Sequence, residues 1–134
     1  MKKICPSALI LSVVFAALLF GSLSCKQPDL PKAMVTVTMV DADGEETPAT
    51  DAMVRVRSAY YEQQMSFVYK EDGTRVPEWI VEVTDGTAQF TFKYEAIYEV
   101  VAWVKTSSTD SITATGILIC KYDEVEEEVL ELEE

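Results

Sequence analysis

The sequence is 134 residues long, and its 23 acidic and 11 basic side chains give a net charge of −12 at pH 7. This length suits one ordinary domain after a leader is removed, and the charge disfavours nucleic acids and anionic lipid surfaces by repulsion. The chain contains no histidine and no asparagine. These absences exclude Ser-His-Asp and Cys-His catalysis, histidine-based zinc or copper sites, and N-glycosylation.

The first 24 residues have the layout of a secretory signal peptide. Two lysines open the chain, residues 8–20 form an uncharged apolar run, and residues 21–24 are mostly small. The alternative is a signal anchor that stays in the membrane, because residues 4–23 are just long enough to span it. Pro6 and the weakly apolar end argue against a retained anchor, so we expect the leader to be removed.

The segment Ser22-Leu-Ser-Cys25 resembles a bacterial lipobox, in which a dedicated peptidase cuts before the cysteine. The resemblance implies cleavage between Ser24 and Cys25 and a thioether from Cys25 to diacylglycerol. Ser22 departs from the family, where leucine is usual, and the alternative is an ordinary secreted protein with a chance cysteine. Several acyl chains on one residue anchor far better than a single chain. Lys26 stands where similar enteric lipoproteins carry the aspartate that retains them at the inner membrane, so we expect a cell-envelope lipoprotein of the outer membrane.

Removal of residues 1–24 leaves 110 residues and takes away two lysines, so the net charge becomes −14. We predict a short lipidated tether over residues 25–32, stiffened by Pro28 and Pro31 because proline cannot pair in a strand ladder. The folded domain is then expected over residues 33–134.

Cysteine usage leaves no possible intramolecular disulfide. Cys5 departs with the leader and Cys25 carries the lipid, so Cys120 stands alone. It lies in the apolar run 116–120, and the chain has no histidine that would activate it. We expect a buried, unreactive thiol.

Alternation of apolar and polar residues predicts strands along most of the domain. In residues 34–40 the alternation directs Val35 inward, and the nearly all-apolar segment 98–105 is typical of a central strand covered on both faces. Residues 60–64 remain open between a loop, a short helix and a crossover. In the acidic tail the residue pattern favours a strand that ends at Leu130 and Leu132, and the alternative is a helix. The predicted strands cover residues 34–40, 52–58, 65–70, 74–76, 79–84, 88–92, 98–105, 112–122 and 125–132.

Three of the five glycines follow an aspartate between predicted strands, at Gly44, Gly73 and Gly86. Glycine accepts positive φ, so these pairs indicate turns. Strand, turn and strand at this spacing indicate a sandwich. We therefore predict an all-β, immunoglobulin- or prealbumin-like sandwich of about seven strands, preceded by a lipoprotein signal peptide.

Four segments together resemble a transthyretin-like or carboxypeptidase-regulatory-like domain: residues 35–44, 52–56, 84–90 and 98–102. The resemblance spans residues 33–132 and rests on turn and core residues, so it implies a fold and not an activity. It implies seven or so strands in two sheets and a role in binding, spacing or assembly. The hydrolase branch of these relatives works with histidines, so its activity cannot be carried over to this chain.

The candidate contact residues are aromatic. Exposed tyrosine and tryptophan rings stack on sugars or anchor a protein partner, although such residues more often cap a core. They are Tyr60, Tyr61, Tyr69 and Trp79.

The segment 41–46 supplies oxygen ligands at Asp41, Asp43 and Glu45. Calcium takes six to eight oxygens, and the full loop pattern is missing here. Turn chemistry explains the segment better. We therefore predict no metal and no cofactor.

The sequence favours a non-catalytic envelope lipoprotein, held in the membrane by lipid on Cys25 and acting as a binding or assembly accessory for an envelope protein or glycan, with no nucleic-acid partner. One alternative is a surface glycan-binding module, and a second is a carboxylate-based enzyme. The tail 123–134 is either an edge strand protected by charge or a docking surface for a basic partner.

Overall fold

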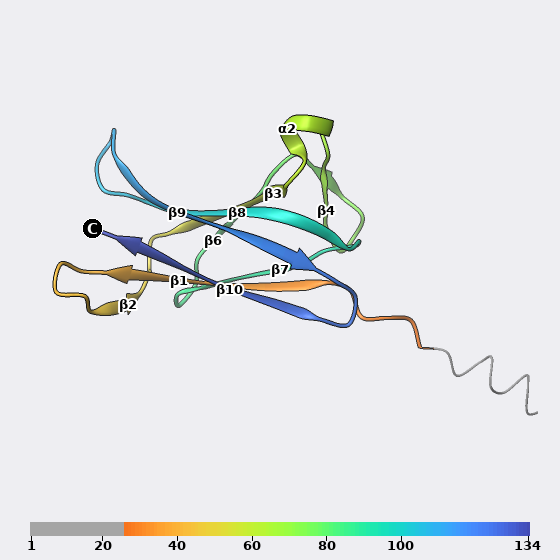
Figure 1. The fold of residues 1–134 in the computed structure, drawn as a ribbon, viewed down its shortest axis with the longest axis horizontal. Helices are drawn as coiled ribbons and strands as arrows, with labels where there is room; N and C mark the ends of the chain where they lie inside the picture. The colour runs from red at the N-terminus through yellow and green to blue at the C-terminus, as the bar shows by residue number, and fades with distance from the viewer. Residues whose placement is uncertain (1–25) are drawn as a thin grey trace, which may run out of the picture.

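The computed structural model describes residues 26–134 (Figure 1). The expected signal peptide, the cleavage site at Ser24 and the lipid-carrying Cys25 lie outside the described residues. The regular structure of the described part is strand apart from one helical turn, which confirms the predicted all-β class. In chain order its elements are β1 (Lys32–Val40), β2 (Glu46–Pro48), β3 (Met53–Ser58), α2 (Tyr61–Gln64), β4 (Val68–Tyr69), β5 (Arg75–Val76), β6 (Trp79–Glu82), β7 (Thr87–Thr91), β8 (Ala96–Lys105), β9 (Ser111–Cys120) and β10 (Val125–Glu133).

Two four-stranded sheets face each other. In the first sheet β1 is central: β10 pairs with one side of it, and β7 and β2 pair with successive parts of the other side. The second sheet has the order β6-β3-β8-β9, and β4 and β5 form a separate hairpin. The sequence predicted a sandwich of about seven strands, and seven strands together with the short β2 build the two sheets. The short strands β4 and β5 lie within the predicted segments 65–70 and 74–76, and β2 is the one strand of residues 26–134 that was not predicted.

The acidic tail is a strand, as predicted. β10 runs parallel to β1 over its whole length, from Lys32 opposite Val125 to Val40 opposite Glu133. Leu130 and Leu132 are buried between the sheets, and the glutamates at alternate positions face solvent. Alternation with a period of two places one set of side chains in the core, which a helix in this position would not do.

The core fills the space between the two sheets. The alternating residues predicted to point inward are buried in β1, β3 and β7. Trp79 of β6 packs its ring edge-to-face against Phe90 and Phe92, with centroids 5.0 and 5.7 Å apart. Aromatic pairs in this geometry add stability beyond the area they bury.

The predicted turns at Gly73 and Gly86 are present. Gly73 has φ +88° in the β4–β5 hairpin, and Asp85 and Gly86 both have positive φ in the turn from β6 to β7. Lys70 and Gly73 close the first turn by a backbone hydrogen bond of 2.8 Å. Glycine reaches these angles without the steric cost that other residues have.

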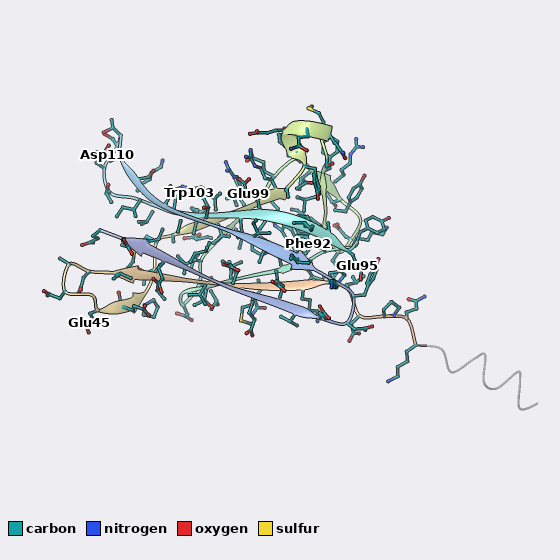
Figure 2. The ribbon with its side chains drawn as sticks, viewed as in Figure 1. Glu45, Phe92, Glu95, Glu99, Trp103 and Asp110 are labelled. Carbon is teal, nitrogen blue, oxygen red and sulfur yellow. The ribbon has the colours of Figure 1, made fainter. Side chains whose placement is uncertain are left out.

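One prediction about β8 is wrong. This strand is central in its sheet, but only one of its faces is covered. Tyr98 and Val100 point into the core, whereas Ile97, Val101 and Trp103 lie on the outer side and stay partly exposed. Figure 2 shows Trp103 on the side of β8 that faces away from Phe92. The reason is that the described domain has two layers of sheet, and only the single helical turn α2 lies over the outer side of the second sheet, where Tyr61 and Glu62 contact Arg57 of β3.

The folded unit begins earlier than residue 33. Pro31 is fully buried, and its carbonyl accepts a hydrogen bond from the Phe92 amide at 2.9 Å. Asp29 is already bonded to Asp123. Residues 29–32 therefore pack with the folded domain, because the burial of Pro31 and these hydrogen bonds hold them there.

The ambiguous segment 60–64 contains the single helical turn α2. The turn ends at Met65, which has φ 52° and donates its backbone N–H to the Tyr61 carbonyl at 2.8 Å. The segment 41–50, which lies between the predicted strands 34–40 and 52–58, contains the short strand β2. No helix in residues 26–134 is long and apolar enough to cross a membrane.

Candidate functional site

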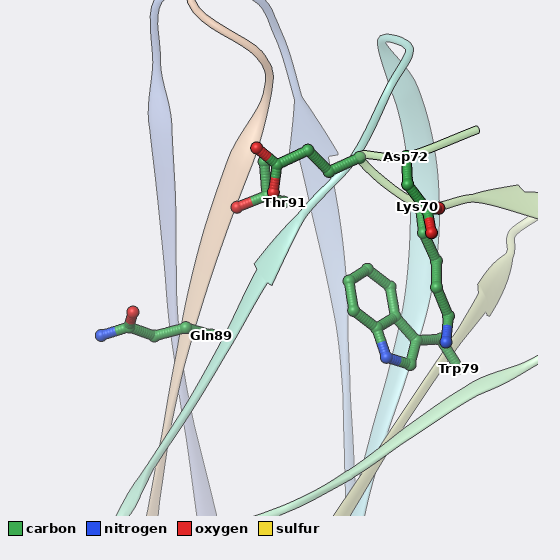
Figure 3. Close-up of a pocket in the computed structure, with 6 residues that line it drawn as sticks. Lys70, Asp72, Trp79, Gln89 and Thr91 are labelled. Atoms are coloured by element: carbon green, nitrogen blue, oxygen red, sulfur yellow. The ribbon is translucent and has the colours of Figure 1, made fainter. Parts of the chain in front are cut away.

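An open depression of about 700 Å³ lies beside the β4–β5 hairpin, between the edge strands β6 and β7. Figure 3 shows the side chains around it. One aromatic ring and five polar or charged side chains line it: Trp79, Lys70, Glu71, Asp72, Gln89 and Thr91. We call this depression the hairpin groove.

Trp79 is the apolar element of the hairpin groove. It lies at the start of β6, and its ring is held edge-to-face by Phe90 and Phe92. It remains half-buried, so part of the ring still reaches the groove. The Lys70 ammonium lies over the ring, 5.1 Å from its centroid. A ring fixed in this way is a rigid platform, because little conformational freedom remains to be lost on contact with a ligand.

The hairpin turn supplies the charged side of the groove. The Asp72 carboxylate accepts a hydrogen bond from the Thr74 amide at 2.9 Å. This bond, with help from the nearby Lys70 charge, holds the pKa of Asp72 below its ordinary value. Asp72 is therefore an ionised hydrogen-bond acceptor at neutral pH and is poorly suited to act as a general acid.

Gln89 and Thr91 supply the opposite side of the groove. Both lie on β7, on the face away from the buried Phe90. An amide and a hydroxyl can each donate and accept hydrogen bonds. Neither residue is among the predicted contact residues, although the alternation of residues 88–92 indicates that both point outward.

Of the four predicted contact residues, only Trp79 lines the hairpin groove. The Tyr61 ring lies 5.8 Å from the Arg57 guanidinium carbon, beside α2. Tyr69 packs edge-to-face on Tyr94, with centroids 5.3 Å apart. Tyr60 precedes α2 and is about half exposed. The structure therefore does not unite the four aromatics in one site.

The predicted oxygen-rich segment is a turn. The Asp41 carboxylate accepts hydrogen bonds from the backbone amides of Asp43 and Glu45, both at 2.9 Å. Figure 2 shows Glu45 at the tip of this loop. Within residues 26–134, no three histidine, cysteine, aspartate or glutamate side chains gather closely enough to hold a metal ion.

Cys120 is buried, as predicted, at the end of β9. Burial, together with the Glu126 charge, raises the pKa of its thiol to about 12. Burial also raises the pKa of Tyr98. A thiol that stays protonated at neutral pH is a weak nucleophile, so Cys120 is a core residue here.

The fold has a counterpart among solved structures. A crystal structure from Pseudomonas aeruginosa, described as a "putative carbohydrate binding protein", superposes with a TM-score of 0.52 and 12% sequence identity, over 82% of this chain and 93% of that chain. The fimbrial anchor protein Mfa2 from Porphyromonas gingivalis gives a TM-score of 0.38 and 11% identity, over 76% of this chain and 50% of that chain. The first likeness defines the class as an all-β sandwich, and the second is too weak to support an argument. No protein-family model and no curated protein matches the sequence.

Proposed function

We propose that this chain is a non-catalytic cell-envelope module that binds a glycan in the hairpin groove and is held to the outer membrane by lipid on Cys25. The observation that carries the proposal is the rigid, half-buried Trp79 ring among five side chains that are each able to form hydrogen bonds. Sugar rings present an apolar face and a rim of hydroxyls. An aromatic platform with a polar rim matches both.

The chemistry of the rim supports binding more than catalysis. Glu71 and Asp72 come from the same turn, so they do not face each other across a bound sugar as the two acids of a glycosidase do. The lowered pKa of Asp72 keeps it an acceptor. The Pseudomonas aeruginosa protein, which has the same class of fold, is described as a "putative carbohydrate binding protein", and this description agrees with the proposal.

The proposed attachment to the membrane rests on the sequence alone, through the lipobox-like segment that ends at Cys25. The structure is compatible with such an anchor, because the described chain enters the domain at Asp29, close to the turn that carries Asp123. The groove is formed by other parts of the chain, at Trp79 and Gln89. A lipid on Cys25 and a glycan in the groove therefore use separate residues.

Tryptophan fluorescence tests the proposal directly, because the chain has two tryptophans. Replacing Trp103, on the outer face of the second sheet, by phenylalanine leaves Trp79 as the only tryptophan. Titration of this variant with purified neutral and acidic envelope polysaccharides should change the Trp79 emission in a saturable way. Failure of every polysaccharide to change it would overturn the proposed ligand class.

Gln89→Ala is the sharper variant, since Gln89 is exposed and its loss should not disturb the core. Loss of one or two hydrogen bonds should weaken binding roughly two- to tenfold. The matched control is Gln64→Ala in α2, which removes the same amide from an exposed position outside the groove. Equal weakening by the two variants would contradict the assignment of the site.

A further inference from the structure

A second depression adjoins the hairpin groove, on the outer face of the first sheet. Its volume is about 140 Å³, and its lining includes Lys32 and Met34 of β1 and Val125 of β10. We call it the sheet hollow. Gln89 and Thr91 of β7 line the sheet hollow as well as the hairpin groove. The two depressions therefore share one wall, which consists of two side chains able to form hydrogen bonds.

Strand register explains why the sheet hollow lies beside the groove. In the antiparallel pair of β7 with β1, Thr91 is opposite Lys32 and Gln89 is opposite Met34. In the parallel pair of β1 with β10, Val125 is opposite Lys32. The residues between these positions in β1 and β7 are buried in the core, so the alternation of the strands places the lining side chains on the outer face.

No strand of residues 26–134 stands between the two depressions. β7 pairs with β1 alone among these strands, so it is the edge of the first sheet at this point. Figure 3 shows the Gln89 side chain extending from β7 on the side away from the Trp79 ring. A third depression of about 180 Å³, near β2, shares no lining residue with either of the other two. A ligand that crosses β7 would therefore contact Trp79 on one side and Met34 on the other.

The sheet hollow repeats the chemistry of the hairpin groove. Met34 is half-buried and Val125 is 56% exposed, so these two residues supply an apolar surface. Lys32, Gln89 and Thr91 supply polar groups around it. An apolar surface with a few hydrogen-bonding groups suits a second sugar ring for the same reason that the groove suits a first.

We propose that the hairpin groove and the sheet hollow bind consecutive units of one uncharged polysaccharide chain, which crosses β7 over Gln89 and Thr91. This inference rests on the proposed function, because it takes Trp79 as the site of the first sugar. Filling the second depression adds contacts without a second loss of translational and rotational freedom. The ligand is then a chain of several units, and a single sugar binds weakly.

The charges around the two depressions favour an uncharged chain. The lining side chains include two lysines, Lys32 and Lys70, and two acids, Glu71 and Asp72, so their charges cancel. β10, which borders the sheet hollow, carries five glutamates. The chain after the leader has a net charge of −14, so the domain as a whole repels a polyanion.

Fragments of graded length test the inference through the fluorescence of Trp79, in the detergent-solubilised full chain with Trp103→Phe. The probes are a purified neutral envelope polysaccharide, the fragments that partial acid hydrolysis gives from it down to single sugars, and an acidic envelope polysaccharide. We expect the affinity to rise about tenfold from a single sugar to fragments of several units, and to level off once both depressions are filled. The acidic polysaccharide should bind more weakly than the neutral one.

Blocking the sheet hollow should remove the gain that comes from length. Val125 and Val129 lie on the outer face of β10 and are 56% and 58% exposed, but only Val125 lines the sheet hollow. In the Trp103→Phe background, Val125→Cys labelled with N-ethylmaleimide should lower the affinity for long fragments about tenfold, to that of a single sugar. Val129→Cys with the same label should leave it unchanged. The labelled parent, which keeps the buried Cys120, controls for other thiols.

The inference is overturned, and the proposed function stands, if a single sugar binds as tightly as the long fragments. The same conclusion follows if the labels at Val125 and Val129 have equal effects, or if the acidic polysaccharide binds more tightly than the neutral one. If no polysaccharide changes the Trp79 emission, the proposed function fails and the inference fails with it.

Discussion

Asp29 and Asp123 exchange hydrogen bonds although they are 94 residues apart in the chain. The Asp29 amide donates to the Asp123 carboxylate at 2.7 Å, and the Asp123 amide donates to the Asp29 carbonyl at 2.9 Å. Asp123 holds a positive φ of 61° in the turn between β9 and β10. The pair fixes the point at which the chain enters the domain.

Two substitutions of Asp123 should show how much its side chain contributes to stability. Asp123→Ala removes the carboxylate and places alanine at positive φ, so we expect the free energy of unfolding to fall by about 1–3 kcal/mol. Asp123→Asn keeps an acceptor oxygen and tolerates this φ, so it should stay within about 0.5 kcal/mol of the unmodified chain. Urea unfolding followed by circular dichroism measures both. Equal losses in the two variants would show that neither an acceptor oxygen nor tolerance of this φ, both of which asparagine retains, is what stabilises the turn.

Gly86 should be more sensitive than Gly44, although both have positive φ. A Cβ at Gly86 would lie 2.9 Å from the Pro48 Cβ, whereas one at Gly44 would meet nothing within 4 Å. Gly44→Ala therefore carries only the backbone cost, and Gly86→Ala adds a steric clash of about 1–3 kcal/mol. Thermal unfolding of the two variants gives the difference. A similar loss from both would mean that β2 moves away from the turn without cost.

Alkaline pH should destabilise the domain through Cys120 and Tyr98. Both have raised pKa values in the folded state, so the unfolded chain loses these protons at lower pH than the folded chain does. The stabilisation that these two protonated groups give the folded state is fully present below about pH 8.5, the pKa of a thiol in the unfolded chain. It is lost as pH rises toward 12, by up to about 1.4 kcal/mol per pH unit for each group.

The variant Cys120→Ala isolates the thiol in this prediction. Its free energy of unfolding should fall less steeply with pH than that of the unmodified chain between pH 9 and 11. Urea unfolding at several pH values gives the two slopes. Parallel slopes would indicate that the thiol ionises equally easily in the folded and unfolded states.

The proposed anchor predicts where the protein fractionates. Cys25→Ala removes the thiol that the lipobox-like segment would present for lipidation, so the protein should leave the membrane fraction when cells are broken and centrifuged. The control is Cys120→Ala, which removes a buried thiol of the domain and should leave the protein in the membrane fraction. Retention of the Cys25→Ala variant in membranes would instead support residues 4–23 as an uncleaved anchor.

The predicted and observed structures agree where side-chain alternation decides the outcome. Val54 and Val56 face the core because neighbouring residues of a strand point to opposite sides. The turns at Gly73 and Gly86 were likewise predictable, because positive φ strongly favours glycine. The coverage of β8 was not predictable. Its outer residues are apolar enough to suggest a covering layer, and only the arrangement of residues 26–134 in space shows that no sheet or long helix of this part of the chain packs on them.

The residues that form the candidate site were harder to predict from the sequence than the strands, because the tertiary structure brings them together. Trp79 was selected from the sequence as an aromatic residue in an irregular region. Lys70 and Gln89, which lie across the groove from each other, are separated by strands of both sheets, and no local pattern relates them. Tyr60 and Tyr61 were selected on the same grounds, as aromatic residues in an irregular region, yet they lie outside the groove.

The sequence alone determined the class of fold, the inward and outward faces of the strands, the tight turns and the isolation of Cys120. These properties follow from local rules: the two-residue period of a strand, the conformational freedom of glycine and the count of thiols. Only the tertiary structure decided which edges stay open and which polar residues surround Trp79. Those depend on strand order, and strand order is set by packing between segments far apart in the chain.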